Sequence, residues 1–430
     1  MALVTAAAAA GVPALGRLAP GALGTALLAR WAGSGAVPAV GAPADAAAPA
    51  GAPPDAIALP VGALGDEAAA AVALGTAPVP EAGARVADGA PGTGGTGGTG
   101  APGGLAVDRY RWLERHYAYI MASQRPTGAI AMTPAQLDIN PYFANRAARA
   151  LLTEPRHLPA VEAYMDWYLA HLNPDGTIDD HRVEAGREVS LGRYDSADSY
   201  AATFLTLVEA YLQAGGDPEW VVQHRSDLDR LVGLLIRLTD PEDGLTWAKP
   251  HYPFKLLMDN VEVWEGLQAW ARVLEAIGEP AAAAGARERA DRIHQGLSRF
   301  RRSDGVYAWG LASFGLRRGG NLQRFYPDAV AQFFPLALGL TDDPAGYEAF
   351  AAAHPAWHRL ESDRFPWMMA AVAAARAGDW ERVAGALAAV ADRYVDLPFP
   401  WYVGESAWLI DLLRVPTPEL VAYWPAPSVP

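Results

Sequence analysis

The chain has 430 residues, 51% of them hydrophobic, and it contains no cysteine, so disulfide bonds and thiol chemistry are excluded. Its formal net charge of -14 at pH 7 argues against a nucleic-acid-binding surface. Beyond the leader, no stretch is long and apolar enough to span a bilayer.

Composition divides the chain near residue 107. Residues 1–107 consist mainly of Ala, Gly, Pro, Val and Leu, with one aromatic residue, Trp31, and a "GTGGTGGTG" run at 92–100. Such a segment cannot build a packed core, and we interpret it as a disordered leader or linker. All Tyr, Phe and His residues lie in 108–430, which we interpret as the globular domain.

The first residues, "MALVTAAAAAGVPALGRLAPGALGTALLARWAG", invite comparison with a signal peptide. The start carries no basic side chain, and Gly, Pro and Arg17 interrupt the apolar run. These features favour a cytoplasmic location, and secretion stays open.

Helical periodicity dominates the globular part, and strand-like alternation is scarce. Start and stop signals predict twelve helices. They cover residues 108–123, 141–152, 157–172, 195–214, 217–238, 259–278, 280–300, 326–340, 344–357, 364–377, 379–394 and 404–414.

Short and long connections alternate between these helices, which is typical of helical hairpins arranged in a ring. The long connections resemble one another, with "PTGAI" at 126, "PDGTI" at 174, "EDGLTW" at 242 and "SDGVYAW" at 303. An open α-solenoid has a similar period, but it does not ordinarily place so many Trp and Tyr residues in loops at one end. The pattern therefore favours an all-α closed toroid of six hairpins, with inner helices beginning near 141, 195, 259, 326, 364 and 404.

Four inner-helix starts carry a resemblance to a known superfamily. They read "INPYFANRAARALL", "YDSADSYAATFL", "LMDNVEVWEGLQAW" and "VGESAWLIDLL". With the twelve alternating helices, they resemble the six-hairpin glycosidase superfamily, the (α/α)6 toroid, over residues 108–430. The resemblance is to inverting glycoside hydrolases of the α-glucosidase I, trehalase and glucoamylase type. It implies a sugar-binding funnel where the inner helices begin.

The resemblance also implies a pair of catalytic carboxyl groups. In the similar enzymes the acid comes from the start of the third inner helix and the base from the sixth, which here points to Asp259 in "MDN" and to Glu405. Glu262 is one turn after Asp259 and could take the acid's role, whereas Glu265 is expected to be buried or paired. The sequence departs from the pattern before Asp259, where "HYPFKLL" replaces a glycine-rich stretch, and the trehalase signatures are absent. Capping or sugar binding is the alternative for Asp259, and a structural helix start is the alternative for Glu405.

Asp195 and Asp198 lie three residues apart at the start of the second inner helix and share one helical face. The resemblance places them at the funnel, where they could bind sugar hydroxyls. The alternative is capping of the helix, for which Asp195 is the better placed of the two.

Aromatic residues in long loops or at inner-helix starts add to the predicted carbohydrate surface, since their faces stack on pyranose rings. The predicted substrate-binding set comprises Asp195, Asp198, Tyr142, Tyr194, Trp247, His251, Tyr252, Asn260, Trp309, Tyr326, Trp367 and Trp401. Four basic residues lie near the same rim, and they could recognise an acidic sugar or form salt bridges, the second being favoured. These are Arg146, Lys249, Lys255 and Arg324.

Other chemistries have weaker signals. His354 and His358 have the spacing of a metal pair, but Pro355 lies between them and no Glu adjoins them, so we predict no metal site and no cofactor. His181 and His251 could act as general bases in an epimerase or lyase on the same toroid. The leading hypothesis is an inverting glycoside hydrolase with a carbohydrate substrate. A sugar epimerase or polysaccharide lyase and a non-catalytic carbohydrate-binding repeat protein are the alternatives.

Overall fold

The computed structural model describes residues 109–415. The predicted leader at 1–107 lies outside the described residues, as do residues 416–430. Within the described part, no helix is both long enough and apolar enough to cross a membrane.

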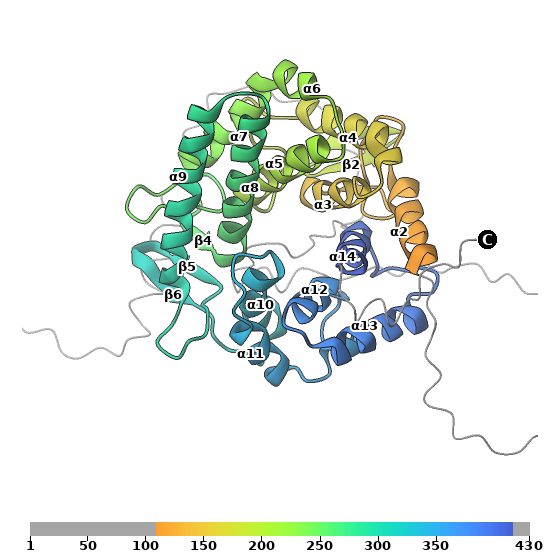
Figure 1. Cartoon of the computed structure of the whole chain (residues 1–430), viewed down its shortest axis with the longest axis vertical. Helices are drawn as coiled ribbons and strands as arrows, with labels where there is room; N and C mark the ends of the chain where they lie inside the picture. Colours follow the sequence, from red (N-terminus) through yellow and green to blue (C-terminus); the bar gives the residue numbers. More distant parts are fainter. Residues whose placement is uncertain (1–108, 416–430) are drawn as a thin grey trace, which may run out of the picture. The chain divides into compact units, whose positions relative to one another are not determined.

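Six inner helices form a closed ring (Figure 1). Each packs against the next in chain order, and the last packs against the first, so the ring has no open end. The inner helices are α3 (Pro141–Leu151), α5 (Ala197–Gln213), α8 (Leu257–Ala276), α10 (Val330–Ala337), α12 (Met368–Arg376) and α14 (Val403–Arg414). This closure confirms the predicted toroid and excludes an open solenoid.

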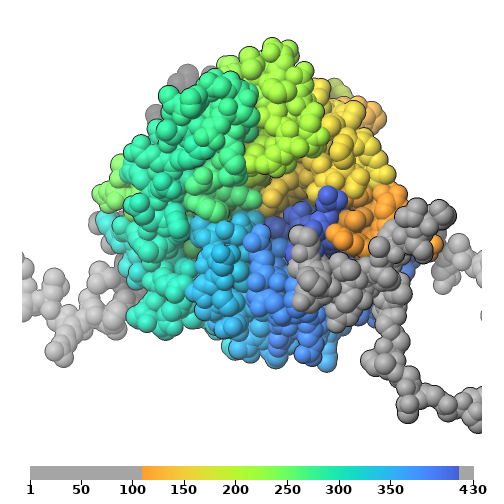
Figure 2. Space-filling view, in the orientation of Figure 1, coloured from red at the N-terminus to blue at the C-terminus, as the bar shows by residue number. Residues whose placement is uncertain are grey.

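The remaining helices form an outer layer around the ring. They are α2 (Arg109–Ser123), α4 (Leu158–Ala170), α6 (Pro218–Gln223), α7 (Arg225–Leu238), α9 (Pro280–Leu297), α11 (Ala345–Ala353) and α13 (Trp380–Arg393). Helix α2 packs on both α14 and α3, so the first described helix covers the junction where the ring closes. The space-filling view shows the same junction, with α2 in orange beside the blue C-terminal helices (Figure 2).

Local sequence explains where the inner helices begin and end. Asn140 accepts a hydrogen bond from the backbone N–H of Phe143 and so caps α3, and Pro141 occupies the first helical position. At the other end, a glycine with positive φ follows four inner helices and turns the chain into the short connection to its outer partner. These glycines are Gly215, Gly278, Gly339 and Gly378.

Three of the four glycines of the repeated long-loop motifs lie directly against a neighbouring outer helix. Gly128, Gly176 and Gly244 all have positive φ. A Cβ on Gly128 would lie 2.1 Å from the carbonyl oxygen of Ala163 in α4, and one on Gly176 would lie 2.6 Å from that of Arg230 in α7. Each turn therefore abuts the next outer helix so closely that only glycine fits.

Two small antiparallel sheets are formed by the long loops. One consists of β1 (Asp138–Ile139), β2 (His181–Glu184) and β3 (Arg187–Ser190), and the other of β4 (Phe254–Leu256), β5 (Gly310–Ala312) and β6 (Leu316–Arg318). Strands β1 and β4 lead into inner helices α3 and α8. Both sheets therefore lie at the end of the ring where the inner helices begin.

Twelve helical regions were predicted, and the structure has helix in all of them. The differences are local. The predicted helix 217–238 is divided at His224 into α6 and α7, and the predicted start at 326 is a π-helical turn, Phe325–Ala329, that precedes α10. Helix α12 begins at Met368 rather than at 364, because Trp367 before it has a left-handed backbone conformation with φ of 59°.

Candidate active site

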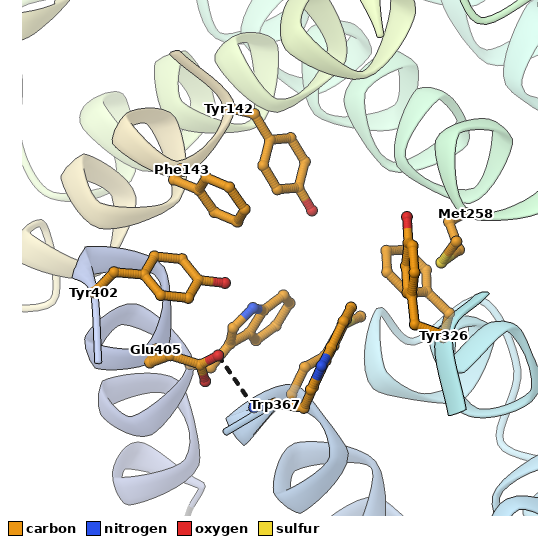
Figure 3. A pocket seen from close by; sticks show the side chains of 10 residues that line it. Tyr142, Phe143, Met258, Tyr326, Trp367, Tyr402 and Glu405 are labelled. Atoms are coloured by element: carbon orange, nitrogen blue, oxygen red, sulfur yellow. Dashed lines mark hydrogen bonds between the residues drawn. The ribbon is translucent and has the colours of Figure 1, made fainter. Parts of the chain in front are cut away.

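A cavity lies at the end of the ring where the inner helices begin, lined by residues of five of them (Figure 3). Its atom-free volume is about 440 Å³, including space open to solvent. The lining residues are Tyr142, Phe143, Met258, Tyr326, Phe334, Trp367, Met369, Tyr402, Glu405 and Trp408. The hydroxyl groups of Tyr142 and Tyr402 point into it (Figure 3). An aromatic wall with a few convergent polar groups is suited to a sugar ring.

Glu405 is the carboxylate that lines this cavity. It lies in the first turn of α14 and is only 1% exposed. Its Oε2 accepts a hydrogen bond of 2.7 Å from the backbone N–H of Met368, and its Oε1 accepts one of 3.1 Å from that of Trp367. Burial raises the pKa of Glu405 to about 7, against the opposing effect of these two hydrogen bonds. The carboxyl can therefore exchange a proton near neutral pH.

Asp259 lies in the first turn of α8, directly after the cavity residue Met258. It is fully buried, and its Oδ2 accepts a hydrogen bond of 2.8 Å from the Ser196 hydroxyl. Its Oδ1 has no hydrogen-bond partner. Asp259 also forms a side-chain hydrogen bond with Asp198, which requires that one of the two carboxyl groups is protonated.

Three buried carboxyl groups are close enough to affect one another at the starts of α5 and α8. Burial raises the pKa of Asp259 to about 7, and the charge of Glu262 adds to this effect. The pKa of Asp198 is raised further, first by burial and then by the charge of Asp259. Two carboxylates in this setting do not ionise independently, and the Asp198–Asp259 pair therefore retains a proton to higher pH than either group alone would.

Glu262 makes strong bonds of its own. Its Oε1 accepts hydrogen bonds from the Tyr142 hydroxyl at 2.5 Å and from Nη2 of Arg146 at 3.0 Å, and its Oε2 accepts one from the Ser199 hydroxyl. These bonds hold both oxygens of Glu262 in the ring interior. The expected pairing of Glu265 is confirmed, since Arg149 donates to it at 3.0 Å.

Three of the predicted sugar-binding aromatic residues, Tyr142, Tyr326 and Trp367, line the cavity. The rings of Tyr326 and Trp367 are stacked, with centroids 5.3 Å apart. Trp401 does not line the cavity: its side chain is fully buried, and its indole N–H donates to the Ser406 hydroxyl at 2.8 Å. A Trp just before an inner helix can either pack in the protein core or line the cavity, and the sequence alone does not distinguish the two positions.

Two further residues of the predicted substrate-binding set do not line the cavity and bond within the protein. Asn260 is fully buried and donates to the backbone carbonyls of Thr246 and Leu256. Asp198 is also buried, and it accepts hydrogen bonds from the backbone N–H of Ser199 and from the Thr246 hydroxyl.

Asp195 is not the cap of α5. The N-cap position belongs to Ser196, whose hydroxyl bonds to Asp259. Asp195 itself is half-buried, one residue before this position.

The other predicted residues lie in the long loops. Tyr252 is half-buried, and the carboxylates of Asp195 and Asp259 both contribute to the raised pKa of its hydroxyl, after burial as the main cause. Nζ of Lys249 lies 5.2 Å from the centre of the Tyr252 ring. These four residues therefore form one polar cluster at the start of α8.

The remaining four loop residues do not line the cavity. Trp309 is mostly buried and stacks on Phe254, while Trp247 packs on the ammonium group of Lys255. His251 is exposed and Tyr194 is half-buried. The structure does not bring these residues together with Glu405.

The basic residues mostly form the predicted salt bridges. Arg146 pairs with Glu262, Lys255 with Asp240 and Asp243, and Arg324 with Asp328. Lys249 instead approaches the backbone carbonyl of Tyr194 at 3.5 Å.

His181 and His354 contact other protein groups through their rings. His181 is buried against Trp167 and His171, and burial lowers its pKa. Nε2 of His354 bonds to the carbonyl of Leu322. Among residues 109–415, no group of three or more His, Asp or Glu side chains is placed to hold a metal ion.

Sequence reasoning missed most of the apolar lining. Met258 lies in the first turn of α8 beside Asp259, and Tyr402 is the N-cap residue of α14, three residues before Glu405. Their closeness in sequence to predicted catalytic residues could have identified them. Phe143, Phe334, Met369 and Trp408 gave no such signal, because they read as ordinary core positions of inner helices.

Comparison with known proteins gives structural neighbours only. No family model matches the chain, and no curated protein matches its sequence. A glycosidase solved in complex with glucose is 15% identical, with a TM-score of 0.52 over 76% of this chain and 100% of its own. A GH63 mannosylglycerate hydrolase from Thermus thermophilus, also in complex with glucose, is 12% identical, with a TM-score of 0.51 over 70% of this chain and 99% of its own.

The chain shares its fold, a closed ring of six helical hairpins, with these two enzymes. An uncharacterized conserved protein from Thermus thermophilus shares it, at 12% identity and a TM-score of 0.51, over 70% of this chain and 99% of that protein. At these identities the likeness concerns the fold, and the chemistry of the six-hairpin ring must be argued from its own residues.

Proposed function

We propose that the protein is a glycoside hydrolase that cleaves an oligosaccharide or polysaccharide with inversion of configuration. In this proposal Asp259 is the general acid and Glu405 is the general base that activates water. The observation that carries it is the placement of two buried carboxyl groups at the starts of inner helices: Glu405 lines the cavity in the first turn of α14, and Asp259 follows the cavity residue Met258 in the first turn of α8. Burial raises the pKa of both groups. Inverting hydrolysis needs one protonated and one ionised carboxyl group at the same pH.

Asp259 suits the acid's role because its surroundings favour the protonated form. Burial and the neighbouring Glu262 charge raise its pKa, and in this proposal Oδ1 is the oxygen that donates a proton to the glycosidic oxygen. Glu262 suits this role less well, since both of its oxygens are already held by hydrogen bonds.

Glu405 suits the base's role because it lines the cavity and two backbone N–H groups stabilise its ionised form. The Tyr326–Trp367 pair would stack on the sugar, and the Tyr142 and Tyr402 hydroxyls would bind its polar edge. The two solved neighbours with glucose bound, a glycosidase and a mannosylglycerate hydrolase, support a sugar as the ligand.

The test is hydrolysis of a panel of neutral and acidic oligosaccharides by the full chain and by the Asp259→Asn and Glu405→Gln variants. We expect reducing sugar to be released from at least one member of the panel, and each variant to lose at least about a thousandfold in kcat/KM. A folded double variant with unimpaired activity would end the assignment.

A non-catalytic sugar-binding protein is the second candidate, and one observation favours it. Both Glu405 oxygens accept backbone N–H groups at the start of α12, which is also what a purely structural cap would do. Binding of a sugar without release of product by any preparation would favour this candidate.

A further inference from the structure

Asp363 contacts a residue of the cavity wall but does not itself line the cavity. It is half-buried in the loop that precedes α12. Its Oδ2 accepts a hydrogen bond of 2.6 Å from the indole N–H of Trp367. The indole nitrogen is the only polar atom of a tryptophan side chain, and it can only donate. Asp363 therefore holds the one hydrogen-bonding group that the Trp367 ring has.

Trp367 connects the two parts of the proposed site. Its ring lines the cavity and stacks on Tyr326, with centroids 5.3 Å apart. Its backbone N–H donates to Oε1 of Glu405 at 3.1 Å (Figure 3). The next backbone N–H, that of Met368, donates to Oε2 of Glu405 at 2.7 Å. The position of Trp367 therefore affects both the surface for a sugar ring and the carboxyl group proposed as the base.

The backbone of Trp367 has an unfavourable conformation. Its φ of 59° and ψ of 53° lie in the left-handed region, where a Cβ is crowded and a bulky residue is rarely found. Such a conformation persists only where the surrounding contacts hold it, and it is most frequent at functional sites. Here Asp363 holds the side chain at its indole nitrogen and Glu405 holds the backbone, so the residue is fixed at both ends.

The charge of Asp363 also acts on Glu405. Burial is the main cause of the raised pKa of Glu405, and the charge of Asp363 adds to it. Asp363 is therefore close enough to influence Glu405 in two ways, through Trp367 and through its own charge. An Asn at this position would separate the two effects, because it is neutral and its side-chain oxygen still accepts a hydrogen bond.

We propose that Asp363 is a positioning residue of the sugar site, which acts by holding the indole of Trp367. With the indole held, the ring stays in the cavity wall as a stacking surface, and the N–H groups of Trp367 and Met368 stay aligned with Glu405. The effect of Asp363 on the reaction rests on the proposed function. Its effect on the conformation of Trp367 does not.

The kinetics of three variants test the effect on the reaction, with an oligosaccharide that the full chain cleaves. Asp363→Ala removes the bond, and kcat/KM should fall at least about tenfold, with KM raised by the displaced ring and kcat lowered by the misaligned base. Asp363→Asn keeps an oxygen that accepts from the indole, so kcat/KM should stay within about threefold of the original.

Asp166→Ala is the matched control. Asp166 in α4 accepts a hydrogen bond of 2.8 Å from the indole N–H of Trp220 in α6, so the same kind of bond is present in the outer layer. Its removal should leave kcat/KM within about twofold of the original, because neither residue lines the cavity.

An NMR measurement tests the positioning without any reaction. The full chain is labelled with ¹⁵N-tryptophan, and each of its 14 Trp residues gives one indole and one backbone signal. The Trp367 signals are the pair that is absent from Trp367→Phe. We expect both signals to move in Asp363→Ala, to stay near their original positions in Asp363→Asn, and to be unaffected in Asp166→Ala.

Unmoved Trp367 signals in Asp363→Ala would overturn the proposal, whatever the activity of the chain. An equal loss of kcat/KM in Asp363→Ala and Asp363→Asn would also overturn it, since the effect would then come from the charge. So would an equal loss in Asp363→Ala and Asp166→Ala, which would indicate general destabilisation. If the full chain cleaves no sugar, the proposed function fails, and the NMR result alone decides whether Asp363 positions Trp367.

Discussion

Replacement of Asp259 by Asn should stabilise the protein while it abolishes activity. The carboxyl is fully buried, its Oδ1 has no partner, and its pKa is raised from 3.8 to about 7. Asn keeps an oxygen that can accept from Ser196, and it removes a charge next to Asp198 and Glu262. A catalytic group held in an unfavourable environment commonly has this signature.

The magnitude follows from the shift of the pKa. A difference of about three pH units between the folded and unfolded states corresponds to roughly 4 kcal/mol, at about 1.4 kcal/mol for each unit. Asp198 shares the same proton with Asp259, so part of this energy remains in the variant. We therefore expect a gain in the free energy of unfolding of about 2–4 kcal/mol at pH 8.

The sign of the pH dependence is fixed. Because the folded-state pKa is raised, the folded protein binds more protons than the unfolded chain between pH 4 and pH 7, and stability of the unaltered protein falls as pH rises through this range. The stabilisation by Asn should therefore be small near pH 4, grow toward pH 7 and stay constant above it.

The assay is urea unfolding followed by circular dichroism at several pH values between 4 and 8. Asp291→Asn is the matched control, because Asp291 is exposed on α9 and lacks these neighbours, and it should change stability by less than about 0.5 kcal/mol at any pH. An Asp259→Asn protein that is no more stable at pH 8, or whose gain does not vary with pH, would refute the reasoning.

Three further predictions concern other parts of the molecule. With pKa values of about 7 for the base Glu405 and for the acid Asp259, kcat/KM should follow a bell-shaped pH profile with its maximum near pH 7, and Glu405→Gln should lose activity across the whole profile. Gly128→Ala should lower the free energy of unfolding in urea by about 3 kcal/mol or more, because the new Cβ would meet the Ala163 carbonyl. Gly278→Ala is the control: Gly278 also has positive φ but has open space around it, and this variant should lose about 1 kcal/mol. Trp401→Phe should lower stability by about 2 kcal/mol and leave KM unchanged, and a changed KM would return Trp401 to the binding site.

The ring was predictable because its signals are local and repeated. Helical periodicity, glycine-terminated helices and the four related turns each repeat along the chain, and together they predict hairpins that close on themselves. The alternation of short and long connections shows which helices pair as hairpins, and no knowledge of distant contacts is needed for this.

The site was predictable only in part, because its residues come from five helices that are distant in sequence. Asp259 and Glu405 could be proposed from resemblance, but the missing partner of the Asp259 Oδ1 depends on how α5 packs on α8. For the same reason, Trp401 and Asn260 could not be recognised as structural, since their burial is a property of the assembled ring.

The configuration of the first product tests the central claim most directly. The full chain is added to an oligosaccharide that it cleaves, and the anomeric proton signals are followed by NMR before mutarotation equilibrates them. The account predicts that the newly released anomer has the configuration opposite to that of the bond cleaved, and that Asp259→Asn and Glu405→Gln release none. A product with retained configuration, or cleavage by both variants at the original rate, would contradict it.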